Sequence, residues 1–216
     1  MRRFAQEKLA PDALERAHDP RFPFEVAELM SAQGLMGITL SEPDGGQGGT
    51  LMDAIIAIEQ VASACPRSAD VVQFGNFGPI RTLAEYGTAA QKVRWLPELL
   101  GGRMVLSLGM SEPDAGSAVT DLKTTAKPDG SAYLVNGTKV FSTFSPDAAL
   151  FLVYVRYGPG LDGIGSVIVE RGAPGFAIGG PSSLIAMSAN FHCRPWNSQS
   201  GRPNCSRLFA CARAAS

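Results

Sequence analysis

The sequence has no apolar run long enough to cross a membrane. Its longest apolar run, around Ala148–Val155, has the length of a strand, whereas a membrane-spanning helix needs about 20 residues. The N-terminus, MRRFAQEKLAPD, lacks the apolar core of a signal peptide. We therefore expect a cytoplasmic protein without a membrane span, in which Asn136-Gly137-Thr138 carries no glycan.

Charge of one sign and paired cysteines are also scarce. The net charge is −1, and only Arg2 and Arg3 form a basic run, so nothing favours nucleic acid or an anionic membrane as a partner. Cys65 stands alone, and the other three cysteines fall in the last 24 residues at spacings of 12 and 6. These spacings match no zinc or redox motif. Although His192 adjoins Cys193, no second ligand pair follows, and we expect no metal site.

The residues that are present favour a globular protein with a helical first half. Hydrophobic residues make up 45% of the chain and charged residues 18%, which supports a core in one large domain or two small ones. Apolar residues recur at helical spacing over Phe24–Gln33. Thr50 is an N-cap candidate for a long helix, and Thr88 with Gln91 forms a capping box. Between these two helices, residues 69–86 are predicted to be helical, with a weak point at GNFGP.

After residue 102 the pattern changes to short β-rich runs separated by Gly, Pro, Asp and Asn. One of them, KPDGSAYLVNG, predicts a hairpin with its turn at Pro128-Asp129-Gly130. The predicted fold class is therefore α+β and multidomain. An N-terminal all-α helical domain over residues 1–102 precedes a mostly antiparallel, β-barrel-like middle domain over residues 103–182.

Residues 183–216 differ from the rest of the chain in composition. They contain arginines but no Asp, Glu or Lys, and they show neither helical nor alternating periodicity. Two interpretations stay open: a disordered tail, or an aberrant tail that is not the natural continuation, as after a frameshift. In either case we expect these residues to be exposed and to lack defined contacts with the β domain.

Two near-identical loops stand 70 residues apart, SEPDGG at 41–46 and SEPDAG at 111–116. The first lies between two predicted helices and the second follows a predicted strand, so the loops are not a tandem repeat. In the second loop, Pro113 stiffens the turn and Gly116 permits conformations that a Cβ would forbid. Its N–H groups and the hydroxyls of Ser111 and Ser117 suit a planar polar ring or a phosphate, although these residues are also ordinary turn formers.

Three longer blocks, Tyr86–Ser117, Leu122–Thr143 and Gly163–Phe176, resemble the acyl-CoA dehydrogenase family in order, spacing and composition. The resemblance covers about residues 20–180. It includes the first SEPD loop, which is similar to a Gly-rich turn near the acyl pocket in the family's N-terminal helical domain. The resemblance implies FAD bound between the middle domain and a C-terminal helical domain. It also implies α,β-dehydrogenation of an acyl-CoA thioester, in which a carboxylate base takes the α-proton and hydride passes to flavin N5.

By this resemblance, the first flavin-binding segment begins at Leu108 and ends at Ser117. Met110 and Ser111 would face the pyrimidine end of the isoalloxazine ring. Gly116 and Ser117 would approach the pyrophosphate and ribityl region, and Ser117 would also touch substrate.

The second flavin-binding segment resembles K-x-W-I-T-N and is KVFSTFS in this chain. Phe141 would cover the ring, and Thr143 would donate to the N5 region. Without the resemblance, Phe141 would be interpreted as a core aromatic, and Ser111 and Thr143 as strand-end residues. The sequence departs from the family at Ala118, where Asp is usual, and at Phe144, where Asn is usual.

The resemblance also implies a C-terminal helical domain, which these residues do not supply. The family's catalytic glutamate lies in the C-terminal helical domain, and the position of Glu112 has a structural role. We therefore expect a truncated, inactive dehydrogenase of fatty acid metabolism. The alternative is a non-catalytic fragment that binds flavin or acyl-CoA weakly or pairs with a full-length relative. An acyl-CoA or nitroalkane oxidase and a purely structural β protein are further interpretations. The partners implied for the whole enzyme are acyl-CoA, electron-transfer flavoprotein and further copies of the chain in a homo-oligomer.

Overall fold

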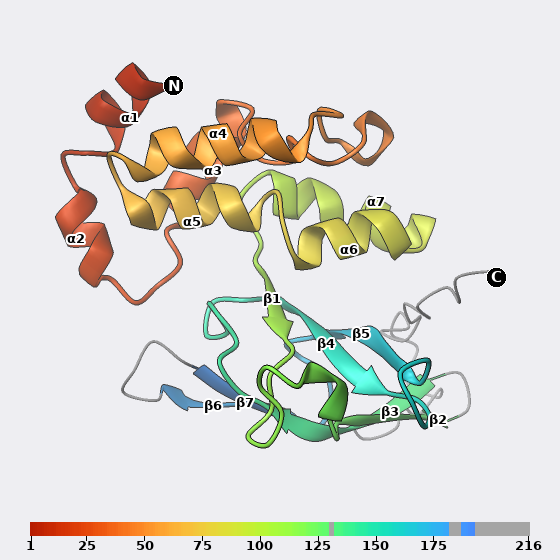
Figure 1. Cartoon of the computed structure of the whole chain (residues 1–216). Coiled ribbons are helices and arrows are strands. Elements are labelled where there is room, and N and C mark those ends of the chain that lie inside the picture. The colour runs from red at the N-terminus through yellow and green to blue at the C-terminus, as the bar shows by residue number, and fades with distance from the viewer. Residues whose placement is uncertain (130–131, 182–186, 193–216) are drawn as a thin grey trace. The chain divides into compact units, whose positions relative to one another are not determined.

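The computed structural model describes residues 1–129, 132–181 and 187–192. The chain divides into two compact units, Met1–Val105 and Leu106–Ser216. The first unit is helical and the second is built on a β-sheet (Figure 1), so the predicted α+β class and the order of its two parts are confirmed. Within the described ranges, no helix has the length and apolar character needed to cross a membrane.

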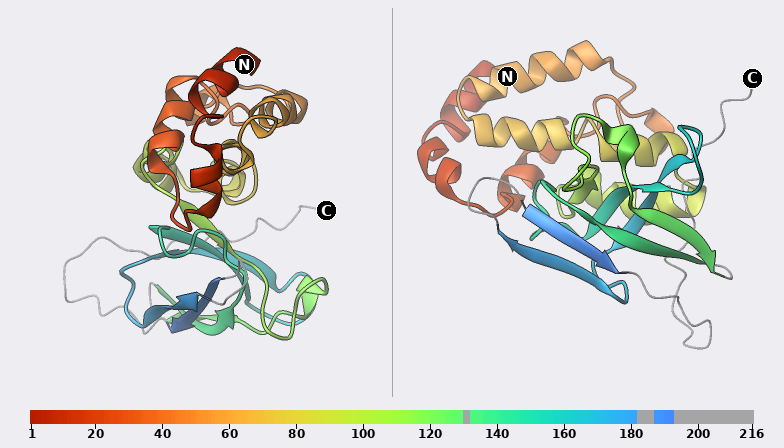
Figure 2. Two further views of the ribbon diagram at one scale, coloured as in Figure 1. Left: turned by 90° about the vertical axis from the view of Figure 1, so that its left-hand side faces the viewer. Right: turned by 60° about the horizontal axis from the view of Figure 1, so that its bottom comes forward.

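The helical unit contains seven α-helices and one short 3-10 helix in its described residues. These are α1 Arg2–Lys8, α2 Ala13–His18, α3 Phe24–Ala32, the 3-10 helix η1 Glu42–Asp44, α4 Leu51–Ala62, α5 Pro66–Phe74, α6 Pro79–Tyr86 and α7 Ala89–Leu100. Helices α4 and α5 lie side by side, as Figures 1 and 2 show.

Capping boxes start the two longest helices. At α4, the Thr50 hydroxyl accepts from Asp53 N at 3.2 Å, and the Asp53 carboxylate accepts from Thr50 N at 2.8 Å. At α7, the Thr88 hydroxyl accepts from Gln91 N at 3.3 Å, and Gln91 Oε1 accepts from Thr88 N at 2.9 Å. The capping box predicted at Thr88 is confirmed, and each pair satisfies N–H groups that a helix start would otherwise leave without partners.

The weak point at GNFGP separates α5 from α6 and is anchored by a buried asparagine. Asn76 Nδ2 donates to the carbonyls of Leu35 and Val72, both at 2.8 Å, and Asn76 Oδ1 accepts from Thr39 N at 3.3 Å. Gly78 has a φ of 66°, which a glycine adopts without strain. The break is therefore a fixed turn rather than a continuous helix.

The β unit contains one 3-10 helix and a sheet whose described strands number seven. In chain order they are β1 Leu106–Gly109, the 3-10 helix η2 Val119–Asp121, β2 Thr125–Asp129, β3 Ala132–Lys139, β4 Leu150–Arg156, β5 Ile164–Glu170, β6 Phe176–Pro181 and β7 Met187–His192. The sheet order is β1-β4-β2-β3-β7-β6, with β5 paired to β4. The contacts of β4 with β1 and β2 are parallel, and the other pairings are antiparallel.

The sheet is open along its described strands rather than a closed barrel. Strand β4 meets β2 only at Thr125 and Arg156, while β1 and β6 stand at opposite ends of the pairing order. The predicted hairpin forms between β2 and β3, but its turn was placed too early, because Pro128 and Asp129 belong to β2 and pair with Tyr133 and Ala132. Gly130 of the predicted turn lies outside the described residues. The longest apolar run of the sequence contains β4, whose Phe151, Leu152 and Val153 are fully buried, as expected for a strand covered on both faces.

Strand β7 corrects the start of the predicted tail. Residues Met187–His192 pair with β3 on one side and with β6 on the other, so the expectation of no defined contact fails for this segment. Residues Met187–His192 do alternate apolar and polar side chains, as a strand does, but this run of six residues was missed within a segment whose overall composition differs from the rest of the chain. The remaining residues of the predicted tail, 183–186 and 193–216, lie outside the described part of the chain.

Candidate functional site

The two segments predicted to share a ligand lie side by side within the β unit. Val140 N donates to Ser111 O at 2.9 Å, and Ser107 Oγ donates to Thr143 O at 2.7 Å. Leu108 lies between these contacts on β1, paired in register with Leu152 of β4. Strand pairing therefore fixes the first segment, and hydrogen bonds bring the second segment to it.

A buried ion pair lies beneath these two segments. Lys139 Nζ lies 2.7 Å from Glu112 Oε1 and donates to Met110 O at 3.0 Å. The exposed fractions of the Lys139 and Glu112 side chains are 0% and 5%. Glu112 also accepts from Lys123 N at 2.6 Å and from Thr124 N at 2.9 Å. This acidic side chain is therefore fully engaged by neighbouring groups of its own unit.

These contacts decide the charge of Glu112. Burial alone would raise the pKa of its carboxyl group, but hydrogen bonds from Lys139, Thr124 and Lys123 lower that pKa to about 2. A carboxylate with so low a pKa is a poor proton acceptor at neutral pH. The geometry agrees with the structural role that the resemblance implies for this position.

Two phenylalanines flank Thr143 in a backbone conformation that is uncommon for such residues. The φ angles of Phe141 and Phe144 are 58° and 57°, in the left-handed region that bulky side chains disfavour. Phe141 is 66% exposed, whereas Phe144 is 3% exposed. The interpretation of Phe141 as a core aromatic is therefore wrong, and Phe144 fills the core in its place.

The turn that leads to Gly116 and Ser117 closes before them. Glu112 N donates to Ala115 O at 2.9 Å, and Ala115 N donates to Glu112 O at 3.2 Å. Gly116 and Ser117 are both exposed. Within the part of the chain described, no hydrogen bond ties them to the segment that contains Phe141.

Position 116 does not require a glycine, contrary to the prediction made from the sequence. Its φ is not positive, and a Cβ at this position would meet nothing within 4 Å. The reason is that Ala115 completes the turn, so the backbone at Gly116 faces open space instead of a crowded neighbour.

Two buried hydroxyls near these segments lack partners. Ser142 Oγ and Thr124 Oγ1 have no hydrogen-bond partner among the residues that the structure describes. Ser142 stands between Phe141 and Thr143 in the chain. Sequence reasoning missed this serine because a Ser beside an aromatic residue in a strand-end segment is common.

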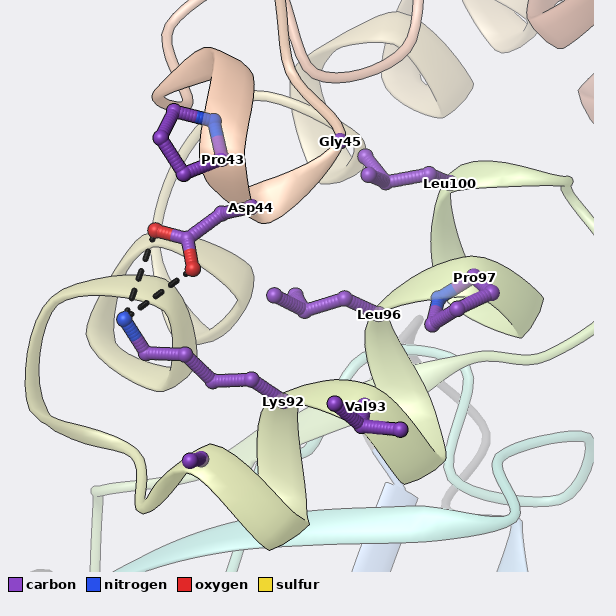
Figure 3. Close-up of a pocket in the computed structure, with 9 residues that line it drawn as sticks. Pro43, Asp44, Gly45, Lys92, Val93, Leu96, Pro97 and Leu100 are labelled. Atoms are coloured by element: carbon purple, nitrogen blue, oxygen red, sulfur yellow. Dashed lines mark hydrogen bonds and ion pairs between the residues drawn. The ribbon is translucent and has the colours of Figure 1, made fainter.

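The first SEPD loop has different surroundings, in the helical unit. It lines a cavity of about 530 Å³ together with α7 (Figure 3). Lys92 Nζ lies 3.1 Å from Asp44 Oδ1, and Ser41 Oγ donates to Asp44 Oδ2 at 2.8 Å. Burial opposes ionisation of Asp44, but the hydrogen bonds from Ser41 and Lys92 lower the pKa of its carboxyl group. Asp44 thus ties the loop to α7. The cavity is lined by Pro43, Asp44, Gly45, Ala89, Lys92, Val93, Leu96, Pro97 and Leu100.

No metal-ligand cluster is found in the described ranges, where no three His, Cys, Asp or Glu residues are grouped to hold an ion. Cys65 is buried, and its sulfur accepts from Arg16 Nη1 at 3.3 Å and from Ser68 Oγ at 3.1 Å. The other three cysteines lie outside the described residues.

Comparisons with known proteins agree with this division of the chain. The family model for the acyl-CoA dehydrogenase N-terminal domain matches residues 1–103, and that for the acyl-CoA dehydrogenase middle domain matches residues 107–196. The acryloyl-CoA reductase (NADH) of Anaerotignum propionicum is 34% identical over 193 residues, which cover 88% of this chain and 49% of the relative. The mitochondrial isovaleryl-CoA dehydrogenase of Oryza sativa subsp. japonica is 34% identical over 198 residues, with coverages of 88% and 48%.

A solved structure is similar over the same part of the chain. The butyryl-CoA dehydrogenase of Megasphaera elsdenii superposes with a TM-score of 0.78 at 28% identity, covering 88% of this chain and 53% of that chain. The chain spans about half the length of the curated relatives it matches.

Proposed function

Because this chain belongs to the acyl-CoA dehydrogenase family, we propose that its β unit binds FAD for the α,β-dehydrogenation of an acyl-CoA. The observation that carries this proposal is the hydrogen bond from Val140 N to Ser111 O. It joins the two segments that the resemblance assigns to the flavin, although they are separated in the sequence.

The residues present fit a flavin. The exposed ring of Phe141 can stack on a planar ligand. The buried Ser142 hydroxyl, which has no partner in the described part of the chain, can turn to a polar group. The open backbone at Gly116 leaves room for a phosphate chain. Aromatic lining with a few placed polar groups is typical of cofactor sites.

Each residue of the site has a proposed role. FAD, when bound, supplies the acceptor for the hydride. Met110 and Ser111 hold the pyrimidine end of the flavin, and Phe141 covers its ring. Thr143 donates toward the N5 region, and Ser117 lies nearest the substrate. Leu108 supports these loops from strand β1, and Gly116 borders the pyrophosphate.

We also propose that these 216 residues alone do not turn over acyl-CoA. The reaction needs a carboxylate that can accept a proton from carbon, and Glu112 is ion-paired with a pKa of about 2. The alternative is a non-catalytic chain that binds flavin or acyl-CoA weakly or pairs with a full-length relative. The same proposal includes electron-transfer flavoprotein as the electron acceptor and self-association of the chain. It also includes a cytoplasmic location and a role in fatty acid metabolism.

The visible absorption spectrum of the purified chain, with and without added FAD, tests the proposal. A perturbed flavin band that persists after removal of free FAD supports flavin binding. If acyl-CoA does not bleach this band, the result also supports the absence of turnover. Bleaching by acyl-CoA would overturn the claim of inactivity. Absence of any bound flavin would overturn flavin binding by this chain.

Two variants sharpen this experiment. Phe141→Ala removes the exposed ring at the proposed site and is expected to weaken FAD binding. Leu161→Ala removes an equally exposed apolar side chain from another loop of the β unit and is expected to leave FAD binding unchanged.

A further inference from the structure

We infer that Glu112 and Lys139 form an ionic clamp that positions the two proposed flavin segments against each other. That the clamped segments hold a flavin rests on the proposed function. That the clamp holds them together rests on the geometry of the β unit alone. Glu112 and Lys139 are positioning residues, since they act through the loops that they join.

Lys139 connects the end of β3 to the first segment. It is the last residue of β3 and directly precedes Val140–Thr143. Its fully buried side chain reaches both the Met110 carbonyl and the Glu112 carboxylate. A shift of the Lys139 ammonium would therefore move the start of the second segment relative to Met110.

Glu112 connects a third stretch of chain to the same point. Its Oε1 accepts from Lys139 Nζ and Thr124 N, and its Oε2 accepts from Lys123 N. Three donors from two separate stretches thus converge on one carboxylate. Such a set of directional bonds is satisfied by one arrangement of the loops and not by neighbouring ones.

Burial and strain both indicate a positioning role. A buried ion pair contributes little net stability compared with an apolar pair of similar volume, because both charges lose their hydration. The pair instead restrains the position of the segment that contains Phe141. The left-handed φ of Phe141 persists only where the surrounding structure holds the backbone in place. Lys139 lies two residues before this strained position.

Three variants separate the clamp from general stability. Glu112→Gln is nearly isosteric but has one acceptor oxygen for three donors, so at least one of the bonds must break. The double variant Glu112→Met with Lys139→Met removes both charges and leaves no unpaired buried ion. It therefore provides a clamp-free protein that is expected to fold even if the single variant does not. The matched control is Asp114→Asn, which removes the Lys123–Asp114 pair of the same unit, 3.0 Å apart and with both side chains more than 70% exposed.

Amide hydrogen exchange of the full chain tests the clamp without any flavin. We expect the Val140 amide, which bonds Ser111, to exchange at least about tenfold faster in both clamp variants. The amides of β4 and β5 should be accelerated less than the Val140 amide, and Asp114→Asn should change neither group. Unchanged exchange at Val140 in a folded variant would overturn the inference. Equal acceleration of Val140 and the β4–β5 amides would also overturn it, since that pattern indicates a loss of global stability.

FAD titration of the same proteins tests the link to the flavin. If the clamp positions the flavin segments, the dissociation constant for FAD rises about tenfold in the clamp variants and stays constant in Asp114→Asn. Faster exchange of the Val140 amide with an unchanged dissociation constant for FAD would overturn the link between the clamp and flavin binding. Absence of FAD binding by the unmodified chain would overturn the proposed function, while the exchange result would still decide whether the clamp exists.

Discussion

Two acidic residues in near-identical loops have different partners and different surroundings. Asp44 binds Lys92 at the edge of a cavity in the helical unit, where both side chains still reach water. Glu112 binds Lys139 in the interior of the β unit. The loops share turn chemistry because Ser, Pro, Asp and Gly suit tight turns. The matching glutamates differ as well, since Glu42 is exposed whereas Glu112 is buried, so the surroundings of each loop determine what its carboxylates do.

Phe141 combines an exposed side chain with a strained backbone, and this predicts opposite effects on stability and binding. Phe141→Gly relieves the left-handed φ and loses little burial, so the free energy of unfolding is expected to rise by about 0.5–1 kcal/mol. FAD affinity is expected to fall, because the ring is gone. Urea unfolding and FAD titration measure the two effects. Phe141→Trp, which keeps both ring and strain, should change neither, and a less stable Phe141→Gly variant would contradict the argument.

The low pKa of Glu112 predicts a loss of stability in acid. Its ordinary pKa of 4.5 falls to about 2 in the folded chain, so its ionisation stabilises the fold above pH 4.5. That contribution disappears as the pH falls from 4.5 toward 2, and we expect the free energy of unfolding to decrease over this range. Urea unfolding between pH 7 and pH 2 measures it. Glu112→Gln should be less stable at pH 7 and show a smaller pH dependence, and identical pH dependences would refute the assignment.

At the scale of elements, local signals placed most helices correctly. Thr50 and Thr88 cap the two longest helices through bonds to residues three positions ahead. These helix starts can therefore be predicted from four consecutive residues. The break between α5 and α6 was visible only as a weak point, because Asn76 anchors it to Leu35 and Thr39 from a distant part of the chain. Strand β7 was missed for a different reason, because the alternation of Met187–His192 is short and lies within a segment of unusual composition.

The capping box of α7 predicts a measurable cost for its removal. Thr88→Ala removes the hydroxyl that accepts from the Gln91 N–H and is expected to lower the free energy of unfolding by about 1 kcal/mol. Thermal unfolding followed by the helical circular dichroism signal checks this. Thr82→Ala is the control, because the Thr82 hydroxyl of α6 donates to the carbonyl of Gly78, the residue before the helix, at 3.3 Å and accepts no N–H of the first turn. Equal losses in the two variants would argue against the capping role.

At the scale of the whole molecule, little net charge coincides with a group of exposed apolar side chains. The net charge is −1, which provides weak repulsion between copies. The exposed large apolar residues of α4 are Leu51, Met52, Ile55 and Ile56. Grouped apolar exposure of this kind favours association.

This combination predicts that one added charge on α4 improves solubility. Met52→Glu places an anion among the exposed apolar residues and is expected to raise the solubility limit near neutral pH. Leu14→Glu adds the same charge at an exposed residue of α2, outside that group, and should have a smaller effect. Precipitation with ammonium sulfate at pH 7 compares the variants, and an equal gain from both would show that net charge alone is responsible.

The sequence by itself determined the features that depend on near neighbours in the chain. Helix starts, the hairpin between β2 and β3, and the buried run in β4 follow from capping residues, turn residues and apolar patterns within short windows. Only the tertiary structure decided that Lys139 reaches Glu112, that Ser107 reaches Thr143 and that Phe141 is exposed. The physical reason is that the first two contacts join residues 27 and 36 positions apart, and strand register and order, which no local pattern encodes, bring them together.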